Sequence, residues 1–129
     1  MENPLLHSFL PIFYISWFDD VLTETEMNTM KEAISAQDWL TKSEKEQLFT
    51  KINVENPPSR KEINDWKEII SKGINEDNDD ELLTDVAVKL ALLENPEINT
   101  EKLKKLYFFL QSLEQSLGII SNEAVFAFK

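Results

Sequence analysis

The sequence predicts an all-α protein: a single-domain bundle of about six to seven helices over residues 1–129. Apolar residues recur at intervals of three and four along most of the chain, which is the spacing of one helix face. Capping residues and prolines separate these segments from one another. No stretch alternates apolar and polar residues for long enough to predict a strand.

The first predicted helix runs from Leu5 to Asp19 and is apolar on every side. Pro11 either bends this helix or lies in its first turn, after Ser8. A helix that is apolar all round is normally buried, so we expect it at the centre of the bundle or beneath a partner. Its apolar residues are Leu6, Phe9, Leu10, Ile12, Phe13, Tyr14, Ile15, Trp17 and Phe18.

Three capping boxes predict where the next three helices begin. In this motif a threonine or serine caps the first turn, and a glutamate three residues later returns the hydrogen bond. The three pairs are Thr23 with Glu26, Thr41 with Glu44, and Ser59 with Glu62. The first of these helices has Met27, Met30, Ala33 and Ile34 on one side, and the second carries Leu48, Phe49 and Ile52. The third has one stripe of Ile63, Trp66, Ile70 and Ile74, with Ile69 beside it.

Prolines and an acidic segment divide the middle of the chain. The residue before a proline disfavours helix, so Asn56-Pro57-Pro58 is predicted to end the third helix and Asn95-Pro96 the fifth. The acidic segment from Glu76 to Glu81 is predicted to be a solvated linker. Its last acids favour the start of a helix from Asp80 to Leu93.

The sixth predicted helix is capped by Thr100 and stopped by Gly118 as a left-handed residue. Its leucine stripe is too short for a coiled coil, so we expect it to pack within the bundle. Ser121 predicts the start of one more helix, and the sequence ends at Lys129 soon afterwards. We therefore expect the chain to be the N-terminal fragment of a longer protein. The stripe consists of Leu103, Leu106, Leu110, Leu113 and Leu117.

The charge of the chain argues against two classes of partner. It has 24 Asp and Glu against 13 Lys and Arg, a formal net charge of −11. This charge repels phosphate backbones and anionic lipid, so we expect neither nucleic acid nor a membrane as the partner. The apolar stretch from Leu5 to Phe18 is shorter than the roughly 20 residues that span a bilayer. Because no basic residue precedes it, no signal peptide is predicted and a cytoplasmic location is expected.

No catalytic or cofactor-binding residue is predicted within the chain. Cysteine is absent, and His7 is the single histidine. Two glycines cannot build a phosphate-binding loop. Any enzymatic activity would therefore belong to a longer protein that contains this segment.

The first predicted turn gathers four carboxylates that are candidate ligands for a divalent cation. Calcium and magnesium prefer oxygen ligands of this kind. The same residues also suit a turn and a helix N-terminus, where negative charge is stabilised, and the sequence favours this structural role. The four candidate metal ligands are Asp19, Asp20, Glu24 and Glu26.

Aromatic residues in the first and sixth predicted helices are candidates for contact with a partner protein. Core packing is the alternative, because aromatic side chains dominate burial. Phe108 and Phe109 lie off the leucine stripe, so either two faces of their helix are buried or the pair covers a neighbouring domain. The candidate contact residues are Phe9, Phe13, Trp17, Phe108 and Phe109.

The segment from Ser16 to Glu26 resembles the aspartate-containing turn of TerB-like (tellurite-resistance) helical domains. Asp19 matches the aspartate of that family and Glu26 its glutamate. Leu113 to Ser121 is similar to the leucine-glycine-isoleucine-serine ending of the same domains. The resemblance implies a single TerB-like domain over residues 1–129.

The chain departs from this family in both acidic turns. Asp20 occupies the glycine position of the first turn. In the segment that loosely repeats it, Asn95 and Lys102 replace the aspartate and the glutamate. If members of the family bind cations with paired acidic turns, half of that site is missing here.

A second resemblance concerns the N-terminal helical extensions of some bacterial acyl-CoA dehydrogenase or oxidase-like flavoproteins. Trp39-Leu40-Thr41 and Pro57-Pro58-Ser59 are the pieces that look similar. This resemblance implies a non-catalytic accessory module whose partner is a downstream domain of the same chain or another subunit. FAD would then bind beyond Lys129, and not in this segment. The alternative is a free-standing cation-binding domain of the tellurite-resistance or stress-response kind.

Overall fold

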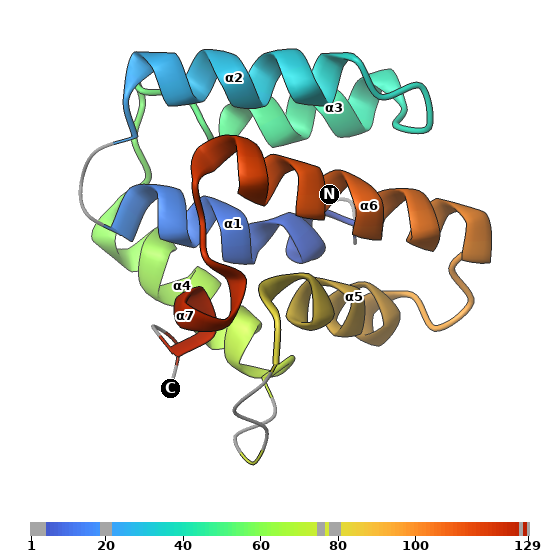
Figure 1. The fold of residues 1–129 in the computed structure, drawn as a ribbon. Coiled ribbons are helices and arrows are strands. Elements are labelled where there is room, and N and C mark those ends of the chain that lie inside the picture. The colour runs from blue at the N-terminus through green and yellow to red at the C-terminus, as the bar shows by residue number, and fades with distance from the viewer. Residues whose placement is uncertain (1–4, 19–21, 75–76, 78–80, 127, 129) are drawn as a thin grey trace.

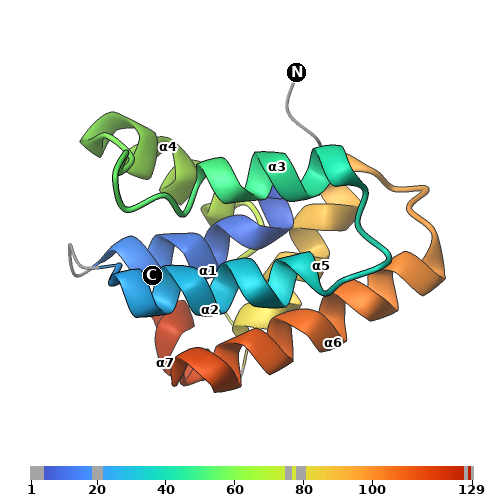
Figure 2. The same cartoon turned by 90° about the horizontal axis from the view of Figure 1, so that it is seen from above.

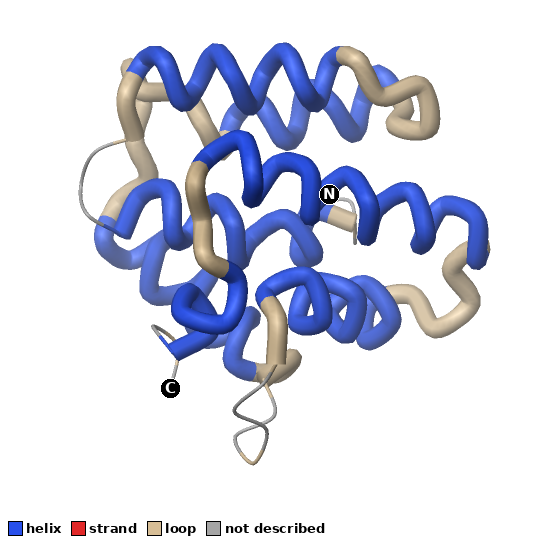
Figure 3. The backbone as a smooth tube through the Cα atoms, in the orientation of Figure 1, coloured by secondary structure: helices blue, strands red, loops and turns tan. Residues whose placement is uncertain are grey.

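The computed structural model describes residues 5–18, 22–74, 77, 81–126 and 128, without the side chains of residues 18, 121, 122 and 126. This part of the chain is all-helical and contains no strand, which confirms the predicted fold class (Figures 1 and 3). None of its helices is both long and apolar enough to cross a membrane. The helices are α1 (Leu6–Phe18), α2 (Glu24–Ser35), α3 (Lys42–Thr50), α4 (Arg60–Ser71), α5 (Leu83–Glu94), α6 (Thr100–Leu117) and α7 (Ser121–Phe126).

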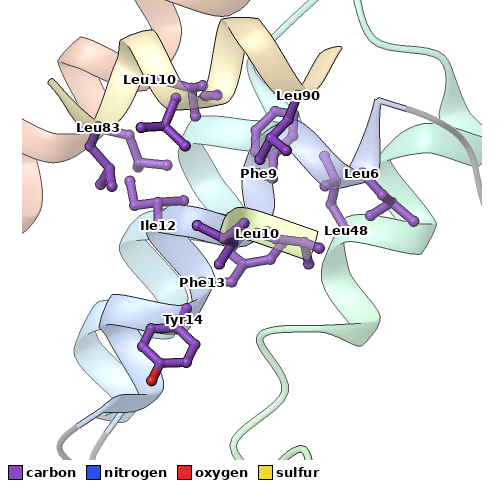
Figure 4. Packing of buried hydrophobic residues seen from close by; sticks show 14 of the residues in the cluster. Leu6, Phe9, Leu10, Ile12, Phe13, Tyr14, Leu48, Leu83, Leu90 and Leu110 are labelled. Atoms are coloured by element: carbon purple, nitrogen blue, oxygen red, sulfur yellow. The ribbon is translucent and has the colours of Figure 1, made fainter. Parts of the chain in front are cut away.

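Helix α1 is the centre of the bundle, as its uniform apolar character predicts. It packs against α5, α4 and α3, while α2 packs against α3 and α6 (Figures 1 and 2). Phe9 and Phe13 are completely buried, and Pro11 lies inside the helix and not in its first turn. Figure 4 shows side chains of α1 beside leucines of other helices, among them Leu48 and Leu90.

Two of the three predicted capping boxes are complete. The hydroxyl of Thr23 accepts from the Glu26 N–H, and the Glu26 carboxylate accepts from the Thr23 N–H. Thr41 and Glu44 form the same pair of hydrogen bonds at the start of α3.

The third box is only half formed. Ser59 Oγ accepts from the N–H of Glu62, as predicted. The Glu62 carboxylate instead accepts a hydrogen bond from the Lys51 ammonium at 3.0 Å. The ion pair with Lys51 therefore replaces the predicted hydrogen bond from the Ser59 N–H to the Glu62 carboxylate.

Replacing Thr23 with alanine is expected to lower the free energy of unfolding by about 1 kcal/mol, because the first turn of α2 loses its cap. Urea unfolding measures this loss. Thr25→Ala is the matched control, because Thr25 is exposed on the same helix and caps nothing. Equal losses in the two variants would show that the cap is not the source of the stability.

Some helix ends differ from the prediction because side chains form other turns. The third helix ends at Thr50 instead of Asn56, since Asn53 Oδ1 accepts from the Glu55 N–H at 3.0 Å and closes a turn there. The cap of α6 is Asn99 rather than Thr100, and Asn99 Oδ1 accepts from two N–H groups of the first turn.

The start of α5 differs from the prediction, whereas the end of α6 agrees with it. Helix α5 starts at Leu83 instead of Asp80, because the Asp85 carboxylate accepts from the N–H of Leu82 and fixes the first turn there. Gly118 is left-handed with φ of 71°, as predicted, and its N–H donates to a carbonyl of the last turn of α6.

Candidate interaction site

A groove lies on the surface between α6 and the connection from α2 to α3. In Figure 1 this connection lies above the orange half of α6. The groove is open to solvent and has a volume of about 420 Å³. The residues that line it are Gln37, Asp38, Trp39, Lys105, Phe108, Phe109 and Ser112.

The floor of the groove is continuous with the aromatic core. Phe109 is only 6% exposed, and its ring centroid lies 6.0 Å from that of Phe9 in α1. Trp39 packs edge-on against Phe109, with ring centroids 6.1 Å apart and planes at 72°. Edge-to-face pairs of this kind are favourable beyond their buried area. The floor and one wall are therefore held in place by the fold itself.

Hydrogen bonds hold the same wall against α2. The Trp39 indole N–H donates to Gln37 Oε1 at 2.7 Å, and the Gln37 side-chain amide donates to the Ala33 carbonyl at 3.0 Å. The Lys45 ammonium in α3 donates to the Ser35 carbonyl, also at 3.0 Å. The first two bonds hold Trp39 to α2 through Gln37, and the third joins α3 to the last residue of α2. The wall is therefore fixed before anything binds the groove.

Phe108 lies on the rim of the groove and is 65% exposed. Its ring packs edge-on against Tyr107, with centroids 5.7 Å apart and planes at 82°. Successive residues of a helix point about 100° apart, so Phe108 and Phe109 face different directions. The predicted aromatic pair is thus divided into one exposed ring and one core ring.

The other predicted contact residues belong to the core of this domain. Phe9, Phe13 and Phe109 are buried. Trp17 is buried as well, and its indole N–H donates to the carbonyl of Lys51 at 2.9 Å. Of the five candidate contact residues, Phe108 is therefore the one whose side chain reaches the surface.

Two lysines lie beside the exposed ring. Lys104 and Lys105 are exposed and stand one helical turn before Phe108. Between residues 102 and 117 the chain contains one acidic residue, Glu114, which is buried. Asp38 on the opposite wall adds one negative charge. Glu101, which is exposed in the first turn of α6, lies one helical turn before both lysines. The two lysines are therefore balanced by Glu101 and Asp38, and these four groups carry no net charge.

A buried ion pair fixes α6 against α3. The Lys102 ammonium lies 3.0 and 3.2 Å from the two carboxylate oxygens of Glu44, and the Thr41 N–H donates to the same carboxylate at 2.8 Å. Burial acts to raise the pKa of Glu44, but the bonds from Thr41 and Lys102 outweigh it and hold the pKa below its ordinary value. Glu44 is therefore a charged structural group.

A second buried carboxylate corrects the interpretation of the acidic linker. Glu81 is 1% exposed and pairs with the Lys89 ammonium in α5. The prediction of a solvated segment is wrong at Glu81, because this residue packs against α5 and its carboxylate pairs with Lys89, eight residues later. Glu81, Asp85, Val88, Lys89 and Tyr107 line a hollow of about 310 Å³ there.

The candidate metal ligands are not assembled in the described structure. Asp19 and Asp20 lie outside the described residues. Glu26 accepts from the hydroxyl of Thr23 at 2.9 Å as part of the helix cap, and Glu24 is exposed in the first turn of α2. Within the described ranges, no three side chains of His, Asp or Glu are grouped to hold a metal ion.

Comparison with known proteins gives no match: no protein-family model, no curated protein and no solved structure corresponds to this chain. The resemblance to TerB-like domains therefore stays a prediction from the sequence.

Proposed function

We propose that this chain is a non-catalytic helical module that binds another protein through the groove between α6 and the α2–α3 connection. The observation that carries the proposal is the position of Phe108. Its ring is 65% exposed on the rim of a groove whose floor and wall are aromatic. Aromatic residues beside a well-packed pocket are typical of the few positions that dominate binding energy at protein interfaces.

In the isolated domain, Phe108 contributes little to the free energy of folding. Burying an apolar side chain gives about 25 cal/mol for each Å² removed from water. Most of the Phe108 ring stays in contact with water in the isolated domain, so its burial adds little to the free energy of folding. A partner that covers the ring would remove this surface from water, and that burial would stabilise the complex. The floor of the groove needs no rearrangement, since Phe109 and Trp39 are already packed together.

Phe108→Ser is expected to change the free energy of unfolding by no more than about 0.5 kcal/mol, as is usual for surface substitutions. Phe109→Ser is expected to cost about 3 kcal/mol or more, because it opens a cavity in the core. Urea unfolding of both variants separates the two roles. A loss in Phe108→Ser that approaches the loss in Phe109→Ser would assign Phe108 to the core and remove the proposal.

Photo-crosslinking in the source cell tests the interaction directly. Phe108 is replaced by p-benzoylphenylalanine in the full chain, and the cross-linked protein is identified by mass spectrometry. Ile120 is the matched control position, because it is 60% exposed and does not line the groove. We expect one protein to be linked at position 108 and not at position 120. No adduct, or the same adducts from both positions, would contradict the proposal.

We further propose that the module is an N-terminal accessory part of an acyl-CoA dehydrogenase-like protein in the cytoplasm. This proposal is supported by the resemblance of Trp39-Leu40-Thr41 and Pro57-Pro58-Ser59 to such extensions. An antibody against the chain measures the mass of the native polypeptide. A band several times larger than 15.0 kDa is expected. A band at 15.0 kDa would exclude the accessory role in a flavoprotein.

A further inference from the structure

We infer that α7 is an exchangeable element: α6 can continue straight through Gly118, and α7 then packs on a second copy of the chain instead of its own. Two copies that exchange α7 in this way form a dimer with a two-fold axis. Neither α7 nor the hinge before it lines the groove beside Phe108. The exchange is therefore independent of the proposed function.

The helix α7 is held in place by the rest of the domain. It has six residues, whereas an isolated helix needs roughly 12–15 to be even marginally stable in water. It packs against α5, and Val125 and the following Phe128 are 2% and 8% exposed. The ring centroid of Phe128 lies 5.0 Å from that of Tyr14 in α1. The site on α1 and α5 therefore fits this segment, and the α7 of a second copy is the same segment.

A hinge of three residues, 118–120, joins α6 to α7 and turns the chain back, so that α7 lies below the red end of α6 in Figure 1. Gly118 is left-handed with φ of 71°, and the helix stops at this residue. A Cβ atom added to Gly118 would meet nothing within 4 Å, so it is the backbone angle and not the space that requires glycine. The bend therefore depends on a conformation that glycine adopts readily and other residues rarely adopt.

The apolar spacing of α6 continues through the hinge. Its leucine stripe extends, at the same intervals of three and four residues, to Ile120 and Ala124. In one straight helix the stripe would reach about three heptads, which is the length at which helices are expected to associate through such a face. In the bent chain, Ile120 is 60% exposed. The exchange brings the hinges of two copies side by side, so each Ile120 can be buried against the other copy.

The hinge decides the balance between monomer and dimer, because the contacts of α7 are the same in both. Association costs entropy, so we expect the wild-type chain to be mainly monomeric at low concentration. Gly118→Ala should raise the dimer association constant at least about tenfold, because alanine disfavours the left-handed bend and favours a continuous helix. Sedimentation equilibrium measures this constant. Gly118→Asn is the matched control: asparagine tolerates the left-handed conformation, so the constant should change by about threefold or less.

A second experiment detects the exchange itself and leaves Gly118 unchanged. The chain has no cysteine, so a Tyr14→Cys chain and a Phe128→Cys chain are prepared separately and mixed at high concentration under mild oxidation. A disulfide between positions 14 and 128 joins the two chains when the α7 of one lies on the α1 of the other. It traps each exchanged pair, so the product accumulates even where the free dimer is a minor form. Phe108→Cys takes the place of Phe128→Cys in the control mixture and should give far less product.

The outcomes are decisive in either direction. A Gly118→Ala chain that keeps its helical circular dichroism and stays monomeric would overturn the inference, as would an equal rise in dimer for Gly118→Asn. A mixture in which position 128 links to position 14 no more than position 108 does would also overturn it. If Gly118→Ala or a cysteine variant fails to fold, the other experiment decides.

Discussion

Replacing Phe9 with alanine is expected to destabilise the domain by about 3–5 kcal/mol. Phe9 is completely buried in the central helix α1, and its ring lies 6.0 Å from those of Phe13 and Phe109. Small domains have a total stability of about 5–15 kcal/mol, so this variant loses a large part of it. The midpoint and slope of urea unfolding give the difference.

Phe108→Ala is the matched control for this prediction. It removes the same atoms from a ring that is mostly exposed, so it should stay within about 0.5 kcal/mol of the wild type. A Phe9→Ala variant within about 1 kcal/mol of the wild type would disprove the central position of α1. The comparison also tests whether Phe109, the floor of the groove, rests on the core.

Replacing Lys102 with methionine is the second large effect. The substitution removes the charged partner of Glu44 and leaves a buried carboxylate with fewer hydrogen bonds. Breaking a fully buried pair costs about 3–5 kcal/mol. We expect about 2–3 kcal/mol here, because the side chain of Lys102 is 32% exposed. Lys104→Met makes the same change at an exposed position and should cost less than about 0.5 kcal/mol.

The pH dependence of unfolding should identify Glu44 as the group concerned. Its pKa is held below the ordinary value of 4.5 in the folded protein, so the unfolded chain binds the proton more readily. The charged form therefore stabilises the fold above pH 4.5, and this contribution is lost as the pH falls towards the lower folded value.

Comparing wild type with Glu44→Gln measures that contribution. The glutamine variant should be less stable at about pH 7, and the difference should shrink at about pH 3. With Lys102→Met as the background, the difference should depend less on pH, because one cause of the lowered pKa is gone. A difference between glutamate and glutamine that stays constant with pH would contradict the assignment.

Local signals predicted most of the fold. The caps at Thr23 and Thr41 and the left-handed Gly118 lie where the sequence places them, since each depends on neighbours within one helical turn. Some predicted helix ends were wrong because a nearby side chain forms a different turn, as Asn53 and Asn99 do. One capping box was incomplete because a distant lysine binds its glutamate. The burial of Glu81 depends on how the chain folds back, which residue spacing does not reveal.

The groove was harder to predict because its two walls are about 70 residues apart in sequence, at positions 37–39 and 105–112. The different positions of Phe108 and Phe109, one exposed and one buried, could have been predicted from residue spacing. Phe109 is three residues after Leu106 and four before Leu113, so it borders the leucine stripe. Phe108 is two residues from both Leu106 and Leu110, which places it on a side of the helix that points away from the leucine stripe.

The indole N–H signals of the three tryptophans give the most direct test of the binding groove. Trp39 lines the groove, whereas the Trp17 indole donates to the Lys51 carbonyl and Trp66 is buried in α4. The ¹⁵N-labelled chain is titrated with the protein cross-linked at position 108. We expect the Trp39 signal to shift while those of Trp17 and Trp66 stay in place. Binding that leaves the Trp39 signal unchanged would show that the partner contacts another face.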